Sequence, residues 1–548
     1  MSNTNHLKKY FFCSFAFNYH DSSVSFAIDN KLVLVLEAER VFREKKKCCN
    51  VQEMEFLVKY GLKILNKKIE EVDFWSMTSL NNPFLEYKDI VYKKQIKSPF
   101  WKLITFFGLS RKVFITNHHI SHAGIYLSTR FKNTLMISCD GGGDTDPITN
   151  NNECLAIFFA EENYIYKLPI DTKNMITGKT YGICATFLYG NDLHSKEPSD
   201  GKFMALAGFG KYNINYTDFI NLIYQKIELS DYPHALDILV KSNFRHLFGI
   251  AKFISKDAKD FAFSVNNFFV KKRLSDISNI IKNVDKRFDS MILVGGVSLN
   301  LDLNTEIYKS YKNKKIFIPP CCDDTGQSVG SVCLLINEIL GIRTKILYPY
   351  LGEGKKYFKF SNIDIDAISN ALINDAVVLI HNGKSEIGPR ALGNRSFLAR
   401  PDRIDLKIRL SENIKQRESY RPISPMVIKE KVFDYFTGPK SLPFMLFKYS
   451  VLSSVIKKVI GCVHVDGSAR VQTVTRRQNK FIYDLILDFG KKTGNYVLLN
   501  TSLNLKGLPL SNSIQDSIHI YNKIDGPKCL VYNGKILFSN CNKELFIN

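Results

Sequence analysis

The chain has 548 residues, a length that excludes a single ordinary hydrophobic core and favours roughly two to four domains. Hydrophobic residues make up 45% and charged residues 23% of the sequence, a balance that is typical of globular proteins and excludes general disorder. The net charge of +22 favours an anionic partner, but it is spread over every segment, so charge alone identifies no ligand.

The 12 cysteines fit neither a disulfide framework nor a zinc site. No CxxC pair has a zinc-type second half, and Cys48/Cys49 and Cys321/Cys322 are adjacent, so we expect reduced thiols and a cytoplasmic location. The apolar run of residues 11–17 lacks the small-residue cleavage site of a signal peptide. Lysines interrupt the longer apolar stretches, and we therefore expect no membrane span.

Short apolar runs that end in Gly or Asp alternate with helical patterns along the chain. Helical periodicity occurs at residues 53–66, 257–283 and 480–492. Apolar runs that predict buried strands opening into polar or glycine-rich loops begin the segments 134–144, 290–300, 376–386 and 495–504. This alternation predicts an α/β protein built from layers of helix and sheet.

A boundary between two domains is indicated at residues 341–358, which combine Pro, Gly and Lys without a clear period. We place a linker at 346–358, with a first domain over 1–345 and a second over 359–548. The lysine-rich region from about residue 210 to 285 carries few motif residues. We expect it to form a helical insertion in the first domain.

A polar turn near the start of the chain separates two apolar stretches. In "NYHDSSVSFAIDNKLV", His20, Asp21 and Ser22 have the character of a hairpin-like phosphate loop. An imidazole, with an unperturbed pKa near ~6.5, is suited to act there as a base. A hairpin turn with a solvated histidine accounts for the same pattern.

Two histidines and two aspartates form a candidate metal-binding set. If a helix begins near Asn117, His118 and His122 share one of its faces. Asp140 leads "DGGGD" and Asp324 lies in "CCDDTGQSVGS", both near expected strand ends. Mixed nitrogen and oxygen ligands favour a six-coordinate iron, manganese or similar ion over structural zinc. Histidine pairs on helices are also common as hydrogen-bonded core or surface residues.

Two glycine clusters follow expected strands. "DGGGD" exposes backbone N–H groups to an approaching phosphate, or forms a tight turn. "GGVSLN" (295–300) suits contact with the adenosine part of a nucleotide, or a simple strand-to-helix turn. Neither cluster has the spacing of a dinucleotide-binding fingerprint or a P-loop, which argues against those two folds.

The second half of the chain is rich in arginines beside small and hydroxyl residues. They occur in "GPRALGNRS" (388–396), "QRESYRPISPMV" (416–427) and "HVDGSARVQTV" (464–474), followed by "LNTSLNLKG" (499–507). Planar guanidinium forks match phosphate or carboxylate, so we expect a site for a small, highly charged oxyanion. Ion pairing with Glu386, Glu418 and Asp466 is the alternative.

These stretches, together with "HDSS", "EAER", "NHHISHA", "GKFMALAGFG" and "DDTGQSVG", occur in one order along the chain. In that order they resemble the O-carbamoyltransferase family of the nodulation-factor, cephamycin and tobramycin carbamoyltransferases. The resemblance implies an N-terminal actin-like ATPase (ASKHA-type) domain followed by a C-terminal YrdC-like α/β domain.

The resemblance also implies an ATP-dependent O-carbamoyltransferase. Carbamoyl phosphate and ATP give carbamoyl adenylate in the YrdC-like domain, and the N-terminal domain transfers the carbamoyl group to a hydroxyl of a sugar or natural-product-like acceptor. The implied cofactors are ATP and a divalent metal, Fe(II), with Mg(II) for the nucleotide.

Carried onto this sequence, the resemblance implies His20 as the catalytic residue. The implied metal ligands are His118, His122, Asp140 and Asp324, with Asp323 as an alternative to the last. Residues implied to bind the nucleotide or carbamoyl adenylate are Gly141, Gly142, Gly143, Lys202, Gly295, Gly296 and Asn300. Residues implied to hold carbamoyl phosphate or the phosphates of ATP are Arg390, Arg395, Ser396, Arg417, Arg421, Arg470, Asn500, Thr501 and Ser502. For Lys202 an exposed structural lysine is the alternative.

One departure from the family pattern and two rival functions remain open. Leu508 stands where the family has an acidic residue, which puts a polar contact there in doubt. A tRNA threonylcarbamoyl-type enzyme fits the basic chain, and an actin-like small-molecule kinase fits the first domain. The sequence has no recognition helix or stacking platform, so we expect no nucleic acid partner.

Overall fold

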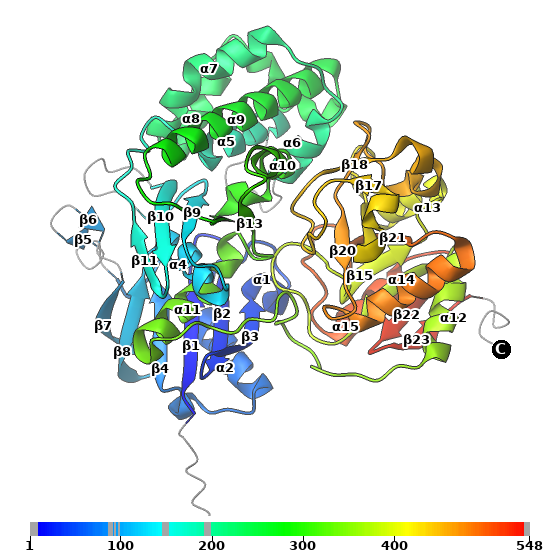
Figure 1. Ribbon diagram of the computed structural model, residues 1–548, viewed down its shortest axis with the longest axis horizontal. Helices are drawn as coiled ribbons and strands as arrows, with labels where there is room; N and C mark the ends of the chain where they lie inside the picture. The colour runs from blue at the N-terminus through cyan, green and yellow to red at the C-terminus, as the bar shows by residue number, and fades with distance from the viewer. Residues whose placement is uncertain are drawn as a thin grey trace, which may run out of the picture. The chain divides into compact units, whose positions relative to one another are not determined.

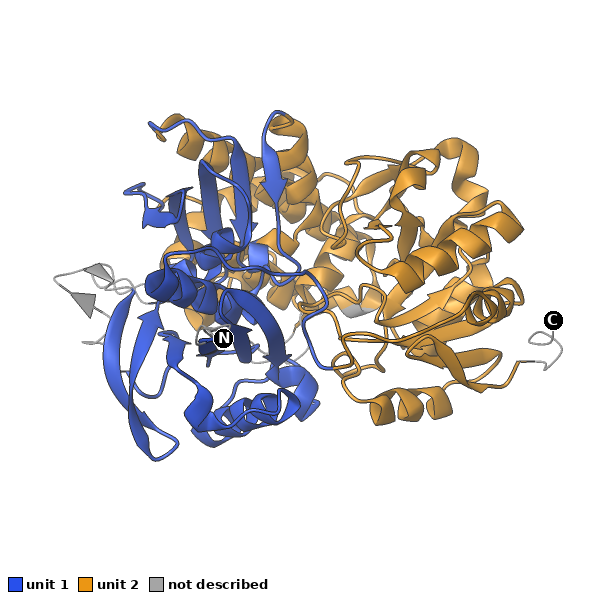
Figure 2. Ribbon diagram, turned by 60° about the horizontal axis from the view of Figure 1, so that its bottom comes forward, with its two compact units in different colours: residues 1–172, 285–297, 313–353 blue, residues 173–284, 298–312, 354–548 orange. Residues whose placement is uncertain are grey.

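The computed structural model describes residues 9–85, 91–92, 95–96, 99–144, 153–190 and 199–541. The chain packs as two compact units (Figure 2). Unit 1 consists of residues 1–172, 285–297 and 313–353, and unit 2 of residues 173–284, 298–312 and 354–548. The units are discontinuous in sequence, so this division differs from the linear one expected at residues 346–358, which stays a prediction.

Unit 1 contains a six-stranded sheet, β3-β2-β1-β4-β8-β7 (Figure 1). Its strands are β1 (Phe11–Ala16), β2 (Ser23–Ile28), β3 (Lys31–Glu37), β4 (Phe74–Thr78), β7 (Phe100–Phe106) and β8 (Leu109–Thr116). β1, β2 and β3 are antiparallel neighbours, and β4 and β8 continue parallel to β1. Helix α2 (Val51–Ile64) has the periodicity expected for 53–66 and buries Met54, Leu57 and Val58 in the core of this layer.

A second sheet of unit 1 repeats this topology in the order β11-β10-β9-β12-β13. Its strands are β9 (Thr134–Cys139), β10 (Leu155–Glu161), β11 (Tyr164–Lys167), β12 (Ser290–Val294) and β13 (Lys315–Phe317). β9, β10 and β11 are antiparallel, whereas β12 and β13 run parallel to β9. The duplicated arrangement agrees with the actin-like part of the expected fold, and the α/β class is confirmed.

Two helices of unit 1 pack against each other beside the sheets, and one of them carries the candidate ligands His118 and His122. Helix α11 (Gln327–Leu340) contacts β1, β2, β4 and α4 (His118–Ala123), and α4 contacts β9 and β10. The helices approach closely because Gly330 has no side chain: a Cβ there would lie 1.6 Å from the Ser121 carbonyl oxygen. The start of α11 is thereby held against the histidines of α4.

Unit 2 begins with a group of helices around α9 (Lys256–Lys282). It includes α5 (Gly178–Tyr189), α6 (Asp200–Ala207), α7 (Ile214–Leu229), α8 (Tyr232–Val240) and α10 (Leu301–Ser310). Helix α9 contacts α5, α6, α7 and α10, so it forms the centre of the group. The region expected to be a helical insertion is therefore helical. In the described part of the chain, no helix combines the length and apolar character needed to cross a membrane.

The remainder of unit 2 is built on a seven-stranded mixed sheet, β20-β16-β21-β15-β14-β22-β23. The strands are β14 (Val377–His381), β15 (Arg395–Ala399), β16 (Ser424–Ile428), β20 (Gln472–Val474), β21 (Val497–Ser502), β22 (Lys528–Tyr532) and β23 (Lys535–Ser539). Helices α12 (Asn362–Ile373) and α14 (Lys480–Thr493) contribute Ile368, Leu372, Phe481 and Leu485 to its core. The antiparallel pairing of β15 and β21 sets Ser396 opposite Ser502, so two predicted site segments meet on adjacent strands.

Candidate metal centre and anion-binding cavity

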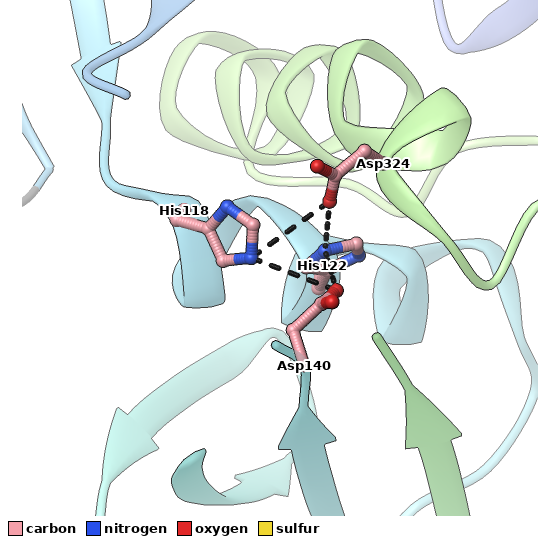
Figure 3. A group of neighbouring side chains, drawn as sticks. All are labelled: His118, His122, Asp140 and Asp324. Atoms are coloured by element: carbon pink, nitrogen blue, oxygen red, sulfur yellow. Dashed lines mark hydrogen bonds and ion pairs between the residues drawn. The ribbon is translucent and has the colours of Figure 1, made fainter. Parts of the chain in front are cut away.

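Four side chains of unit 1 converge as a candidate metal centre (Figure 3). His118 and His122 lie on α4, Asp140 follows β9, and Asp324 begins the short helix η6 (Asp324–Gly326). The Nε2 of His122 lies 3.2 Å from Asp324 Oδ1 and 3.7 Å from Asp140 Oδ2. The Nε2 of His118 lies 3.8 Å from each of the same two oxygens. One ligand atom from each residue falls within 4.8 Å of all the others.

The donor set fits a divalent cation. His118 and His122 are 1% and 0% exposed, and Nε2 of His118 has no hydrogen-bond partner among the described residues. A buried nitrogen that faces two carboxylates without a partner is suited to a cation. Two imidazoles with two carboxylates favour Fe(II), Mn(II) or a similar ion over the sulfur-rich sites of structural zinc.

Hydrogen bonds fix the start of helix α4, which carries the two histidines, and they fix the carboxylate of Asp140. The Asn117 side chain caps α4 by accepting from the Ile120 N–H, and Asp144 accepts from the His118 N–H at 2.6 Å. Asp140 accepts from the N–H groups of Gly141 at 2.7 Å and Gly296 at 2.8 Å. These bonds orient the carboxylate of Asp140, which therefore needs no rearrangement to present an oxygen to a cation.

Each of the two predicted glycine clusters contains a position near the centre where only glycine fits. Gly295 has a φ of +88°, and a Cβ there would lie 2.1 Å from the Cys139 carbonyl oxygen. At Gly143 a Cβ would lie 2.2 Å from the Glu153 carbonyl oxygen. Both predicted glycine clusters thus have a packing reason in unit 1, which leaves their predicted contact with a nucleotide a prediction.

Of the adjacent aspartates, Asp324 joins the centre and Asp323 does not. Burial alone would raise the pKa of Asp324, but the charges of His118 and His20 and the bond with His122 hold it well below its usual range. Burial and the charge of Asp21 raise the pKa of Asp323 to about 7. The Asp323 carboxylate accepts from Thr325 Oγ1 at 2.5 Å, so it serves the turn that leads into α11.

His20 lies beside the centre. Its Nδ1 is 2.8 Å from Asp21 Oδ2 and 3.7 Å from Asp324 Oδ2, and its side chain is 43% exposed. Burial disfavours the imidazolium, but the hydrogen bond to Asp21 and the charges of Asp21 and Asp324 outweigh it and raise the pKa of His20 to about 10. With no cation bound, these interactions favour the protonated form of His20.

A cavity of about 510 Å³ lies within unit 2. The predicted anion-binding residues in its wall are Arg390, Arg417, Arg421, Arg470, Asn500, Thr501 and Ser502. Residues of α6, α9 and α10, such as Met204, Phe263 and Asp302, complete the wall. The structure thus brings together arginines from three separate sequence motifs.

The guanidinium groups in this cavity are close enough to repel one another. Burial and the charges of Arg421 and Arg390 lower the pKa of Arg417 to about 9. Burial and the charges of Arg390, Arg417 and Arg421 also lower the pKa of Arg470. Glu418 pairs with two basic residues beside the cavity. Its Oε2 lies 3.6 Å from Arg421 Nη1, and its Oε1 lies 3.2 Å from Lys202 Nζ. The cavity wall also carries the acidic side chains of Asp302, Glu306 and Asp466 and the lysines Lys271 and Lys448. The basic groups outnumber the acidic ones, which leaves the cavity suited to a multiply charged anion.

Hydrogen bonds fix the loop that carries Arg390. The Glu386 carboxylate accepts from the backbone N–H groups of Leu392, Asn394 and Arg395. Asn500 Nδ2 donates to the Ala391 carbonyl at 3.0 Å. The loop is therefore fixed on two sides, by Asn500 of strand β21 and by Glu386, which precedes the loop in sequence.

Arg395 and Ser396 are not brought to the cavity. The Arg395 side chain is 1% exposed, and its guanidinium donates to the carbonyls of Asn382, Gly383 and Asn394. Ser396 Oγ accepts from the Gly393 N–H at 3.0 Å. Both residues bond to the loop and neither lines the cavity, so the direct anion contact expected from their motif stays a prediction.

Lys202 and Asn300 also have structural partners. Besides its ion pair with Glu418, Lys202 lies over the ring of Tyr189. Asn300 caps α10 by accepting from the Leu303 N–H, and it donates to Asn266 Oδ1 at 3.2 Å. Neither residue lines the cavity, so a nucleotide contact stays a prediction for both.

Two polar residues that the motifs did not single out contribute to the sites. Gln327 is fully buried against the candidate metal ligands. Lys415 is 2% exposed and donates to the carbonyls of Ser502 and Asn504, each at 2.6 Å. Asn504 Nδ2 donates to the Leu508 carbonyl, so the turn closes through its backbone where the family's acid is missing.

Comparison with known proteins agrees with the expected family. The family model described as Carbamoyltransferase N-terminus matches residues 12–333, and the one described as Carbamoyltransferase C-terminus matches residues 369–537. The nodulation protein NolNO of Sinorhizobium fredii is 27% identical over 548 residues, covering 91% of this chain and 76% of that protein.

A second relative covers a similar extent. The protein MJ1051 of Methanocaldococcus jannaschii is 28% identical over 550 residues, covering 94% of this chain and 97% of that protein. Among solved structures, full-length HypF in its phosphate- and nucleotide-bound form has 14% identity and a TM-score of 0.33, over 61% of this chain and 57% of its own. Because the two family models together span most of the sequence in order, this chain belongs to the carbamoyltransferase family.

Proposed function

We propose that this carbamoyltransferase is an ATP-dependent O-carbamoyltransferase whose YrdC-like C-terminal domain (residues 359–548) makes carbamoyl adenylate and whose N-terminal domain (residues 1–345) transfers the carbamoyl group to an acceptor hydroxyl. Water first releases phosphate from carbamoyl phosphate and leaves carbamate. A carbamate oxygen then attacks the α-phosphorus of ATP, and pyrophosphate leaves. Finally the acceptor hydroxyl attacks the carbamoyl carbon, AMP leaves, and the hydroxyl proton passes to a base.

The observation that carries the proposal is the group of four guanidiniums in one cavity, Arg390, Arg417, Arg421 and Arg470. Their mutual repulsion is unfavourable without an anion and is relieved by one. Carbamoyl phosphate and the triphosphate of ATP both have the required charge. The same donors favour the charge that develops on phosphate oxygens during phosphate and pyrophosphate release.

In unit 1, the candidate cation ligands are His118, His122, Asp140 and Asp324. A bound divalent cation acts as a Lewis acid, which polarises a carbonyl or phosphoryl oxygen. His20 is the proposed base for the acceptor hydroxyl. Asp21 and Asp324 favour its protonated form, and a cation on Asp324 would oppose that effect, so the base role belongs to the cation-loaded protein.

The test is isotope exchange between labelled pyrophosphate and ATP in the absence of acceptor. We expect exchange that requires carbamoyl phosphate, because only adenylation of carbamate returns label to ATP. ATP turnover to ADP without exchange would instead indicate an actin-like kinase. Binding of tRNA with a steep salt dependence would favour the threonylcarbamoyl alternative. Mass spectrometry of cell extract supplied with ¹³C-carbamoyl phosphate, ATP and enzyme would then identify the carbamoylated acceptor.

A further inference from the structure

Gln327 contacts three of the four candidate metal ligands without being one of them. It is the first residue of α11, and its side chain is 0% exposed. Its amide Nε2 lies 2.7 Å from His118 Nδ1, 2.9 Å from Asp324 Oδ1 and 3.4 Å from His122 Nε2. One buried amide thus faces both types of ligand in the centre.

The hydrogen bonding of this amide is incomplete in the cation-free arrangement. Gln327 Oε1 is buried and has no hydrogen-bond partner among the described residues, and the same is true of His118 Nε2. An imidazole that binds a metal is neutral, so His118 in the cation-bound protein has one donor nitrogen and one nitrogen with a free lone pair. If the amide NH₂ donates to His118 Nδ1, the ring proton is on Nε2, and Nε2 then has no lone pair for a cation.

Rotation of the amide by 180° reverses this assignment. The oxygen and nitrogen of a glutamine amide have nearly the same shape, so the pocket admits both orientations. With Oε1 towards His118, Nδ1 becomes the donor and Nε2 presents its lone pair to the two carboxylates. The rotation also withdraws the NH₂ group from Asp324 Oδ1 and moves it to the buried position of Oε1, which has no partner among the described residues. It releases two ligand atoms at once, and cation binding must offset the hydrogen bond that is lost.

We infer that Gln327 is a positioning residue that fixes His118 as the tautomer with its proton on Nδ1, and so makes Nε2 a metal ligand. The inference rests on the cation of the proposed function. With Oε1 towards His118, the amide oxygen lies near the Asp324 carboxylate, and a cation on that carboxylate offsets their repulsion. Cation binding and amide orientation therefore favour each other.

The residues around Gln327 leave the amide little other freedom. The close contact between Gly330 and Ser121 fixes the first turn of α11 against α4, and Asp324 precedes Gln327 by one short helical turn. The side chain cannot turn to solvent, since it is fully buried. Its amide can exchange oxygen for nitrogen, but it cannot leave the ligands.

Metal affinity is the test, because it needs no catalytic turnover. Wild type, Gln327→Glu, Gln327→Leu and Gln327→Met would be titrated with Co(II), and with Fe(II) under anaerobic conditions, against a chromophoric chelator. We expect the Leu and Met variants to bind roughly 10–100-fold more weakly, the usual effect of losing a partner of a histidine ligand. Glu supplies an acceptor for Nδ1–H, so Gln327→Glu should keep wild-type affinity or better, with the visible spectrum of bound Co(II) retained.

The melting temperature of each metal-free variant separates this role from simple loss of packing. Gln327→Met keeps an unbranched side chain of similar length, so weak binding by a variant that melts like wild type supports the inference. Equal affinity of wild type and Gln327→Met overturns it, and so does loss of binding in Gln327→Glu, while both results leave the proposed function standing. Wild type that binds neither metal overturns the inference together with the cation of the proposed function. The pyrophosphate exchange assay still tests adenylation separately.

Discussion

Arg417 and Ser502 meet at the end of strand β21, where Nη2 of the guanidinium lies 3.3 Å from the serine Oγ. Nη1 lies 3.1 Å from the Thr501 Oγ1, so the two hydroxyls hold the fork in one orientation. The remaining donors of Arg417 face a cavity lined by three further arginines. An anion that enters the cavity therefore meets a charged group whose orientation is already fixed.

We predict that Arg417→Ala raises the KM for carbamoyl phosphate by roughly 10–100-fold, the effect of losing a hydrogen bond between charged groups. Ser502→Ala should have a smaller effect, since it removes an uncharged hydroxyl of the cavity wall and one of the two hydroxyls that orient Arg417. Steady-state pyrophosphate release is the measurement. Arg403→Ala is the control, because Arg403 is 45% exposed and pairs with Asp375 and Asp405 at the surface. An unchanged KM in Arg417→Ala would remove Arg417 from the anion site.

Arg390 and Arg395 belong to one motif but should respond differently to substitution. Arg395→Ala leaves several buried carbonyls without their donor, so we expect the free energy of unfolding to fall by roughly 3 kcal/mol or more. Arg390→Ala should change stability little and abolish phosphate binding, since Arg390 lines the cavity. Chemical denaturation and calorimetric titration with inorganic phosphate measure the two effects. The assignment fails if Arg395→Ala is stable and binds no phosphate.

The four candidate metal ligands could be predicted from sequence, because each is either close to another ligand along the chain or at the end of an expected strand. His118 and His122 share a helix face because of their spacing, and Asp140 and Asp324 follow strand-like runs. The sequence identifies Arg395 as a donor, but it does not tell where the side chain points. That direction depends on the turn formed by residues 382–394, which supplies the carbonyls.

Gln327 and Lys415, which the sequence motifs do not identify, act through contacts between segments far apart in the sequence. Gln327 reaches His118 only because α11 and α4 pack closely, and the two residues are 209 positions apart. Lys415 reaches Asn504 across 89 positions. Neither residue has a local pattern that distinguishes it from an ordinary helical or surface residue. The helical wall of the cavity was unpredictable for the same reason, since its residues come from α6, α9 and α10.

The two adjacent aspartates offer a matched pair of variants. Asp324→Asn should weaken Co(II) binding by more than 100-fold, because it replaces a charged ligand with a neutral amide. Asp323→Asn should bind Co(II) within about threefold of wild type, since Asp323 bonds to Thr325 and lies outside the ligand set. Competition with a chelator gives both affinities. The reverse order would make Asp323 the ligand.

A glycine in the helix contact provides a test of how the centre is assembled. Gly330→Ala places a Cβ where only 1.6 Å separates it from the Ser121 carbonyl oxygen, so α11 and α4 must move apart. We expect a lower melting temperature and weaker Co(II) binding, although no ligand is changed. Gly341→Ala is the control for helix α11, since a Cβ at Gly341 meets nothing within 4 Å. Because Gly341 has a φ of +65°, alanine there should lower the stability modestly, but we expect Co(II) binding to be unchanged. Normal metal binding by Gly330→Ala would show that the helix contact does not set the ligand geometry.

Arg470 tests whether the cavity is built for an anion at the expense of stability. Its side chain is half-buried in the cavity wall, where Arg390, Arg417 and Arg421 repel the guanidinium, and its Nε donates to Ser424 Oγ at 2.9 Å. Removing one of four mutually repelling guanidiniums relieves that repulsion, and an apolar side chain of similar length keeps much of the packing of the arginine stem. We therefore expect Arg470→Met to melt at the wild-type temperature or higher when no anion is present.

When phosphate is present, wild type should melt at a higher temperature than Arg470→Met. Bound phosphate stabilises wild type in proportion to the logarithm of its concentration over Kd, and Arg470→Met should lose most of this increase because its Kd is larger. Thermal melts over a series of phosphate concentrations, at constant ionic strength set with chloride, separate binding from general screening. An Arg470→Met variant that melts lower without phosphate yet gains as much as wild type from it would mean that Arg470 supports the fold and leaves the anion to the other three arginines.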